Sequence, residues 1–415
     1  MLFRSPENIE EAKVKLDDNQ QGEKSGVNVE ETNIKRENKE NIEELKVPEW
    51  SVFDLPPESG FSVISPEISV QIKQKTFDTP PIIQEIFEKI ASICENGFDF
   101  MNQRISFEKF LEFFKAVNQI IPKLSEKITQ TDCKSCVFYI GDSHGSIEDM
   151  YKTIAFFMQI FEKDNQIKFV FVGDYVDRNP WDLQNLAFVV GFALLYRNNV
   201  VLLRGNHEDR TINTHYGFID NLLRAFWDQG TELYDEIIKF FIKLPIANIT
   251  QIFSQNDQPP ARVLSVHGGI PVDQTDFFKP IILTEIKDKV TSEVERSEEM
   301  DPLTVSMLWA DPDEMIKGIV TDDQGSGRLR FGEPVFELFM GANNLHLLVR
   351  GHQKWNDGIR IFFQNRLYSL FSTSKYDDRK KFNPKILQLA YGKSPVIHEI
   401  DEQTFLKVIE SYTPN

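Results

Sequence analysis

The chain has 415 residues, and its 41% hydrophobic content is sufficient for a sizeable core. A formal net charge of −18 disfavours a nucleic-acid-binding protein or one that docks on an anionic membrane, because both usually present a basic face. Three cysteines without framework spacing are typical of a reducing compartment, so we expect a cytoplasmic protein, with the nucleus as an alternative.

Residues 1–75 are predicted to form a disordered, charged N-terminal tail. The first 46 or so are dense in Glu, Lys, Asn, Asp and Gln, and bury too little apolar surface to offset the entropy of ordering. They also lack the apolar stretch of a signal peptide. Further on, the tail contains Trp50, Phe53, Phe61 and several prolines. An extended strap on the folded domain or a docking segment are therefore alternatives to a solvated tail.

Residues 76–132 are predicted to be a helical lead-in that packs on the sheet that follows. Two apolar stripes recur at helical spacing, made of Ile82, Ile83, Ile86, Phe87 and Ile90, and of Phe107, Phe110, Leu111, Phe113 and Phe114. Ser106 is a suitable N-cap for the second helix. Cys133 and Cys136 form a CxxC without a second ligand pair, which favours a loop that enters a strand over a zinc or redox site.

Residues 133–400 are predicted to form one α/β domain, and residues 401–415 a C-terminal tail. The first half alternates strand and helix as Cys136–Ile140, Ile147–Phe161, Phe169–Val172, Trp181–Tyr196 and Val200–Leu203. This βαβαβ order implies a parallel sheet. The apolar run Leu186–Tyr196 is too short to span a bilayer and reads as a buried crossover helix. From Val263 onward, strands mixed with loops indicate a second sheet.

Glycine-flanked polar motifs follow five apolar runs of the domain. The first three strands lead into Gly141-Asp142-Ser143-His144-Gly145, Gly173-Asp174-Tyr175-Val176-Asp177-Arg178 and Gly205-Asn206-His207-Glu208. Two later runs, Val263–Val266 and Leu345–Val349, lead into His267-Gly268-Gly269 and Arg350-Gly351-His352. Asp142, Asp174 and Asn206 are spaced 32 residues apart, which is one βαβ unit. We therefore expect the motifs to meet at the carboxyl edge of the sheet.

Six of these residues offer ligands for metal ions: Asp142, His144, Asp174, Asn206, His267 and His352. Mixed oxygen and nitrogen donors suit manganese, iron or zinc better than calcium. Six ligands are too many for one catalytic ion with an open position. We therefore predict two divalent ions (Mn²⁺, Fe²⁺ or Zn²⁺) about 3.5–4 Å apart that share one carboxylate, acidify a bridging water and hold phosphate oxygens.

Three further residues suggest phosphate ester chemistry. His207 is placed to protonate a leaving alkoxide, and Asp177 to orient its ring. Arg178 offers a planar fork for phosphate oxygens. A single histidine after a strand is more often a core residue, but four of the seven histidines lie in such motifs, which favours a site.

The five motifs, in this order, resemble the signature of the PPP family of serine/threonine protein phosphatases, within the calcineurin-like metallophosphoesterase superfamily. The resemblance covers about residues 137–389 and includes Tyr216-Gly217-Phe218 and Leu308-Trp309-Ala310-Asp311-Pro312. It implies a β-sandwich flanked by helices. It also implies one metal held by Asp142, His144 and Asp174, and a second held by Asp174, Asn206, His267 and His352. His207 becomes the general acid, paired with Asp177, and Arg178 a phosphate clamp.

The sequence departs from that family pattern at three places. Asn179 replaces the usual Gly, and Asn is a residue that tolerates a left-handed backbone. The family's Arg-Gly pair is missing from the segment around Arg328 and Arg330, so either arginine is a candidate second phosphate ligand. Tyr376 is kept in an altered loop, in which Asp377 stands in place of Cys. We assign substrate binding to Arg178, Arg328 and Tyr376.

The sequence thus predicts a metal-dependent serine/threonine phosphatase that attacks phosphoprotein esters with a hydroxide bridging two metal ions. A dinucleoside-tetraphosphate-type hydrolase is one alternative, because its motifs are similar. A weakly active scaffold that binds phosphoproteins is another, since the arginine segment is altered. Expected partners are phosphoprotein substrates and a regulatory subunit, without nucleic acid or membrane.

Overall fold

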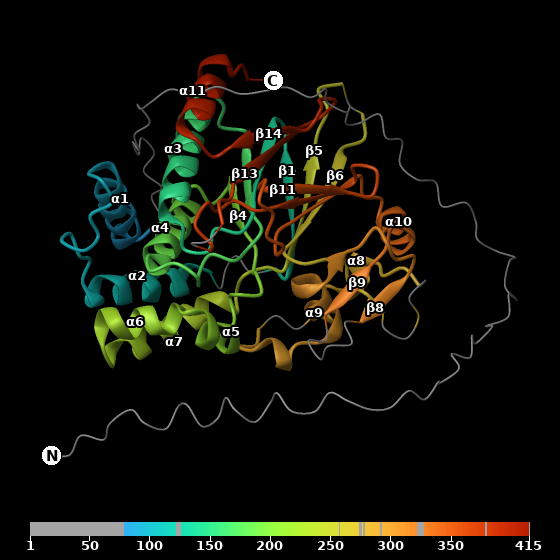
Figure 1. Ribbon diagram of the computed structural model, residues 1–415. Coiled ribbons are helices and arrows are strands. Elements are labelled where there is room, and N and C mark those ends of the chain that lie inside the picture. The colour runs from blue at the N-terminus through green and yellow to red at the C-terminus, as the bar shows by residue number, and fades with distance from the viewer. Residues whose placement is uncertain are drawn as a thin grey trace, which may run out of the picture. The chain divides into compact units, whose positions relative to one another are not determined.

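The computed structural model describes residues 79–121, 126–256, 258–273, 276, 279–290, 293–321, 328–377 and 380–414 (Figure 1). The predicted tail, with its aromatic residues, lies outside these ranges. Within them, no helix combines the length and the apolar character needed to cross a membrane.

Helices and strands alternate through most of the described chain. The helices are α1 (Pro81–Glu95), α2 (Phe107–Ile120), α3 (Ile147–Lys163), α4 (Asp182–Leu195), α5 (Arg210–Tyr216), α6 (Phe218–Phe226), α7 (Gln229–Phe241), α8 (Leu283–Ile286), α9 (Pro302–Trp309), α10 (Glu333–Ala342) and α11 (Glu402–Ser411). The strands are β1 (Ile128–Cys133), β2 (Cys136–Ile140), β3 (Lys168–Phe171), β4 (Val200–Leu202), β5 (Ala247–Ile252), β6 (Ala261–Val266), β7 (Asp311–Pro312), β8 (Ile319–Thr321), β9 (Leu329–Phe331), β10 (Leu347–Arg350), β11 (Ile359–Phe362), β12 (Leu367–Leu370), β13 (Lys385–Ala390) and β14 (Val396–Glu399).

The strands form two large sheets and one small one. The first sheet has the order β14-β13-β2-β3-β4, the second β1-β5-β6-β10-β12-β11, and the small sheet β7-β9-β8. Strands β2, β3 and β4 are parallel, as the βαβαβ pattern predicted, and β13 joins β2 antiparallel. The parallel register aligns the ends of the three strands, which lead into the first three motifs.

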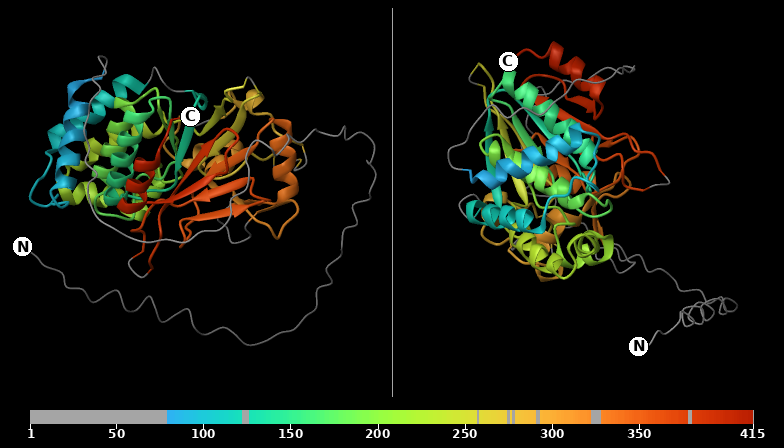
Figure 2. Two further views of the ribbon diagram at one scale, coloured as in Figure 1. Left: turned by 90° about the horizontal axis from the view of Figure 1, so that it is seen from above. Right: turned by 90° about the vertical axis from the view of Figure 1, so that its left-hand side faces the viewer.

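Alternating side chains of β2 explain the layered arrangement. Val137 and Tyr139 belong to an apolar cluster that also contains Val263 and Val349 of the second sheet. Phe138, on the opposite face, belongs to the cluster shared with the helices. One face of the first sheet therefore packs on the second sheet and the other under helices, which Figure 2 shows from two sides. The predicted β-sandwich flanked by helices is confirmed.

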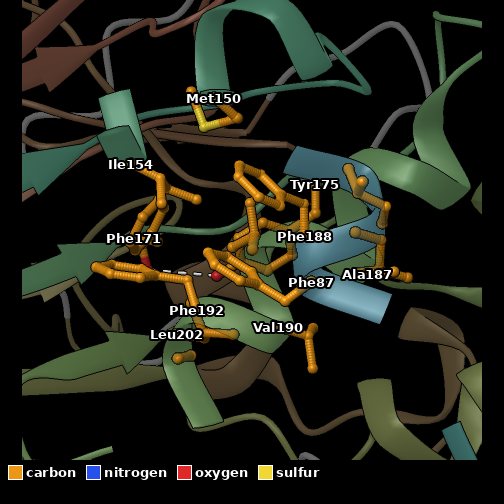
Figure 3. Close-up of a cluster of buried hydrophobic side chains, with 14 of the residues drawn as sticks. Phe87, Met150, Ile154, Phe171, Tyr175, Ala187, Phe188, Val190, Phe192 and Leu202 are labelled. Carbon is orange, nitrogen blue, oxygen red and sulfur yellow. Dashed lines mark hydrogen bonds between the residues drawn. The ribbon is translucent and has the colours of Figure 1, made fainter. Parts of the chain in front are cut away.

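Aromatic side chains fill the layer between the first sheet and its helices (Figure 3). Phe87 of α1 stacks on Phe188 of α4 with ring centroids 4.6 Å apart. A Cβ atom on Gly191 would lie 3.1 Å from Cβ of Phe87, so the glycine allows the close approach of the two helices. Helix α2 packs on α7. The lead-in helices, expected on the sheet, thus form a second helical layer over α4 and α7, and Ser106 caps α2 as predicted.

Two predicted boundaries are corrected by the structure. Ile128–Cys133, placed at the end of the helical lead-in, is strand β1, which pairs parallel with β5 in the second sheet. The segment expected as a C-terminal tail contains α11, whose N-terminus is capped by Asp401. Phe405 of α11 stacks on Phe156 of α3 at 4.2 Å between centroids, so the apolar face of α11 covers α3. Both corrections arise from contacts with residues far away in the sequence.

Candidate active site

The motif residues leave their strands in left-handed backbone conformations. His144, Asp174 and His352 have φ angles of 41°, 58° and 69°. Residues other than glycine adopt this region rarely and often at functional sites, where the surrounding structure holds them. A Cβ atom on Gly173 would lie 2.4 Å from the backbone nitrogen of Gly205, so only glycine lets these two loops meet. The result is a tight edge on which the polar side chains converge.

Asp174 lies at the centre of the convergence. Its Oδ2 is 3.4 Å from Nε2 of His144, and its Oδ1 is 3.3 Å from Nε2 of His267. It is common to two groups of side chains with the spacing of metal ligands, one with His144 and His207 and one with His267 and His352. A single carboxylate therefore stands between two ligand clusters.

Asn206 joins the second cluster through its side-chain oxygen. Oδ1 of Asn206 lies 2.7 Å from Nε2 of His267 and 2.9 Å from Nδ1 of His352. Nδ1 of His267 is 2.9 Å from the carbonyl oxygen of Val172, which can only accept a hydrogen bond. In the neutral ring, Nε2 of His267 therefore carries a lone pair that faces other acceptors. This donor set fits a divalent cation.

Asp142 provides a second sign of a cation site. Its Oδ1 accepts a hydrogen bond from the backbone of His352 at 2.9 Å, but its buried Oδ2 has no hydrogen-bond partner among the described residues. That oxygen lies 3.8 Å from Nε2 of His144. A buried carboxylate oxygen without a donor is costly, and a metal ion would satisfy it. The described side chains thus fit a divalent metal centre.

The pKa values of the cluster reflect its crowding. Burial, together with the neighbouring charge of Asp174, raises the pKa of Asp142 to about 7. Burial and the nearby His207 lower the pKa of His144 to about 3. For His267 burial acts in the same direction, but the carboxylates of Asp174 and Asp142 outweigh it and raise its pKa to about 9. Carboxylates and imidazoles compete here for protons that metal binding would displace.

His207 is tied to a carboxylate beside this cluster. Its Nδ1 donates to Oδ2 of Asp177 at 2.7 Å. Asp177 also accepts from the side chain of Asn213 at 2.9 Å and from the backbone of Phe218 at 3.0 Å, so its orientation is fixed. Burial disfavours the imidazolium, but the charges of Asp174 and Asp177 outweigh it, and the pKa of His207 is raised.

Glu208 holds the loops that carry the cluster, a role that the sequence reasoning missed. It accepts hydrogen bonds from the backbone nitrogens of Asp174, Tyr175 and Gly205 at 2.8, 2.8 and 2.7 Å. The signal was available, because Glu208 ends a recognised motif. The spacing of residues in the sequence does not reveal that the carboxylate of Glu208 accepts hydrogen bonds from the backbone of the neighbouring loop.

A cavity of about 370 Å³ opens beside the cluster. Its lining comprises His144, Asp174, Arg178, Asn206, His207, Tyr216, Trp309, Asp311, Arg328, His352, Gln353, Lys354, Trp355 and Tyr376. The guanidinium of Arg178 lies over the ring of Tyr216 at 4.0 Å and near that of Tyr376 at 4.9 Å. The structure thus places Arg178 and Tyr376 together at the cavity.

The two candidate arginines of the altered segment lie in different places. Arg328 lines the cavity, with its guanidinium 5.2 Å from the ring centroid of Trp309. Arg330 pairs with Asp313 at 2.6 Å and does not contribute to the cavity lining. Of the two, Arg328 is therefore the one positioned to meet a ligand.

The expectation that Asn179 adopts a left-handed backbone is wrong. The left-handed residues of this turn are Asp177 and Arg178, with φ angles of 69° and 77°, and not Asn179. The side chain of Asn179 instead donates to the carbonyl oxygens of His144, at 2.6 Å, and of Lys375. It links the loop of a candidate metal ligand to the loop of Tyr376. The sequence alone does not predict this contact.

Comparison with known proteins agrees with the resemblance of the motifs. A probable serine/threonine-protein phosphatase of Encephalitozoon cuniculi (strain GB-M1) is 29% identical over 286 residues, which cover 69% of this chain and 57% of that protein. The serine/threonine-protein phosphatase 6 catalytic subunit of Caenorhabditis elegans is 30% identical over 260 residues, which cover 62% of this chain and 70% of that protein.

The fold has a counterpart among solved structures. A protein serine/threonine phosphatase from Saccharomyces cerevisiae superimposes with a TM-score of 0.58 at 21% identity, over 73% of this chain and 88% of that chain. The family described as calcineurin-like phosphoesterase matches residues 137–355, which contain all five motifs. The family predicted from these motifs is confirmed, and the chain belongs to the calcineurin-like phosphoesterases.

Proposed function

We propose that this protein is a metal-dependent serine/threonine protein phosphatase. The observation that carries the proposal is the position of Asp174, which is shared by two ligand clusters beside a cavity lined with arginine. The relatives named as serine/threonine phosphatases support the substrate class.

The metal ligands in this proposal are Asp142, His144 and Asp174 for one ion, and Asp174, Asn206, His267 and His352 for the other. When bound, two divalent ions acidify a water molecule and neutralise phosphate charge. The mixed donors make Mn²⁺, Fe²⁺ and Zn²⁺ the candidates. His207 belongs to the first cluster by distance, but the carboxylates of Asp174 and Asp177 raise its pKa and favour the protonated ring, which suits a proton donor better than a ligand.

The remaining residues orient and protonate the substrate. His207, held by Asp177 with a raised pKa, gives its proton to the leaving serine or threonine oxygen. Arg178 and Arg328, which both line the cavity, bind the phosphate oxygens. Tyr376 keeps Arg178 in place through its ring.

The test is hydrolysis of a phosphothreonine peptide with Mn²⁺, run beside diadenosine tetraphosphate. We expect turnover of the peptide and loss of most of that turnover, about 10²–10⁴-fold, in His207→Ala. Turnover of the dinucleotide alone would establish the alternative hydrolase. Metal binding without turnover of either substrate would favour the phosphoprotein-binding scaffold.

Two other expectations stay predictions. A regulatory subunit would be recovered by affinity purification of the full chain from cell extract. A cytoplasmic location would be tested by fractionation of cells that express the tagged protein, with nuclear enrichment as the contrary result.

A further inference from the structure

Lys354 is a cationic residue of the cavity for which the proposed chemistry has no role. It lies two residues after the candidate ligand His352, and both residues line the same cavity. Its Nζ lies 5.5 Å from the ring centroid of Tyr376, whose ring also faces Arg178. The ammonium group therefore lies at the cavity but outside the two groups of candidate metal ligands.

The charge of Lys354 is not neutralised within the described part of the chain. Two arginines close in sequence do have partners there: Arg350 pairs with Asp311 at 2.9 Å, and Arg360 pairs with Glu314 at 3.4 Å. No described carboxylate pairs with Lys354, and its side chain is exposed. A positive charge is thus available to a ligand in the cavity, in a chain whose formal net charge is −18.

The backbone that carries Lys354 is fixed on both sides. Gln353 accepts a hydrogen bond from Arg350 at 2.7 Å. The indole nitrogen of Trp355 donates to Ser369 at 3.0 Å, and the guanidinium of Arg360 lies 5.1 Å from the Trp355 ring. The base of Lys354 is therefore held, so a new ion pair would cost the rotamer entropy of this side chain but not the ordering of its loop.

Resting on the proposed function, we propose that Lys354 forms a second anion subsite, which selects substrates with a carboxylate or phosphate close to the phosphorylated residue. Lys354 and Arg178 face one ring, so their charges are at most about 10 Å apart, the span of about three extended residues. A negatively charged side chain one or two positions from the phosphorylated residue reaches Lys354 while the reacting phosphate lies beside Arg178.

The experiment compares kcat/KM for loss of the phosphothreonine phosphate alone, followed by fragment mass so that hydrolysis of a flanking phosphoserine is counted separately, in peptides that differ only in the flanking positions. Each peptide carries Gln, Glu, phosphoserine or Lys one or two residues before or after the phosphothreonine. We expect Glu to raise kcat/KM about threefold over Gln, and phosphoserine about tenfold, on at least one side. A larger gain with phosphoserine than with Glu would identify a second phosphate as the preferred anion.

Two variants assign the preference to Lys354. Lys354→Gln is expected to reduce the Glu-to-Gln ratio of kcat/KM to about one, and Lys354→Glu to favour the Lys-flanked peptide instead. Lys375→Gln is the matched control, because Lys375 pairs with Glu148 at 2.6 Å outside the cavity lining, and it should keep the ratio. The preference should also weaken as salt rises.

The outcomes separate this inference from the proposed function. A wild-type protein that hydrolyses every peptide at the same rate would overturn the inference and leave the phosphatase function standing. A Lys354→Gln variant that slows all peptides equally would also overturn it, since Lys354 would then bind the reacting phosphate itself. Absence of hydrolysis of any phosphopeptide would instead refute the proposed function.

Discussion

Two buried regions at the same sheet differ completely in chemistry. On the helix-covered face, Phe87 and Phe188 are both 0% exposed and stack on each other. At the carboxyl edge of the same strands, Asp142 and Asp174 are 0% and 1% exposed, yet they are surrounded by histidines. Burial stabilises the fold in the first region, whereas in the second it confines charges that favour cation binding. The degree of burial alone therefore does not distinguish a region that stabilises the fold from a candidate binding site.

The largest expected effect on activity comes from removing the carboxylate of Asp174, which both ligand clusters share. Asp174→Asn keeps an oxygen for the hydrogen bond from the backbone of His207 but removes the charge common to both ligand clusters. Loss of an outer-shell partner alone typically costs about 10–100-fold, so we expect activity to fall at least about 10³-fold.

The companion measurement is stability without metal. In EDTA, Asp174→Asn is expected to stay folded but to lose about 1–3 kcal/mol of the free energy of unfolding, because its attraction to His207 and His267 is lost while its repulsion with Asp142 is relieved. A variant that unfolds, or one that keeps full activity, would contradict this separation.

The opposite result is expected in the aromatic layer. Phe188→Ala removes a fully buried ring that stacks on Phe87, and should lower the free energy of unfolding by about 3–5 kcal/mol. Urea denaturation gives this value, and kcat measured on the folded protein should stay within about twofold. Phe188→Leu is the conservative control, with a smaller loss. A large fall in kcat of folded Phe188→Ala would show that the two regions are coupled.

Buried histidines of the two regions should respond differently to pH, because their pKa values are shifted in opposite directions. His398 packs near the rings of Phe138 and Phe156, and burial lowers its pKa to about 4, whereas carboxylates raise that of His267 to about 9. Between about pH 4 and 6.5 the unfolded chain binds a proton at His398 that the folded chain does not. The free energy of unfolding should therefore fall as pH decreases through this window, by about 3 kcal/mol in total from this residue.

The variant His398→Gln should remove that part of the pH dependence. We expect a shallower decrease in stability between pH 6.5 and 4 in urea denaturation of the metal-free protein. His215→Gln, at an exposed position of α5, is the control and should keep the slope of the wild type. Equal slopes in all three proteins would refute the assignment to His398.

Local patterns were sufficient for the elements that deliver the motifs. Continuous apolar runs located β2, β3 and β4, with helices alternating between them, and the glycines marked where the strands end. The roles assigned to the individual site residues stay predictions. What the structure adds is that their side chains do lie together, with Asp174 between two clusters.

The features that sequence reasoning missed depend on contacts across long stretches of chain. Strand β1 was assigned to a helical segment because its partner β5 is more than a hundred residues away. Arg328 and Arg330 are two residues apart, so strand alternation places them on one face, and only their different neighbours, Trp309 for Arg328 and Asp313 for Arg330, distinguish them. Asn179 acts through two carbonyl oxygens, one of them on a distant loop, and its residue type alone does not indicate this contact.

The position of β13 affects when the first sheet can assemble during synthesis. This strand lies between β2 and β14, although it follows all strands of the second sheet in the sequence. During synthesis, β2 therefore waits with an open edge until nearly the whole domain has emerged, and such edges readily pair with other chains. Gly141, the first residue after β2, likewise receives its hydrogen-bond partner Ser372 late. The first motif loop thus becomes complete only after Ser372 and β13 have emerged, so a shorter nascent chain would carry most of the candidate ligands without an assembled site.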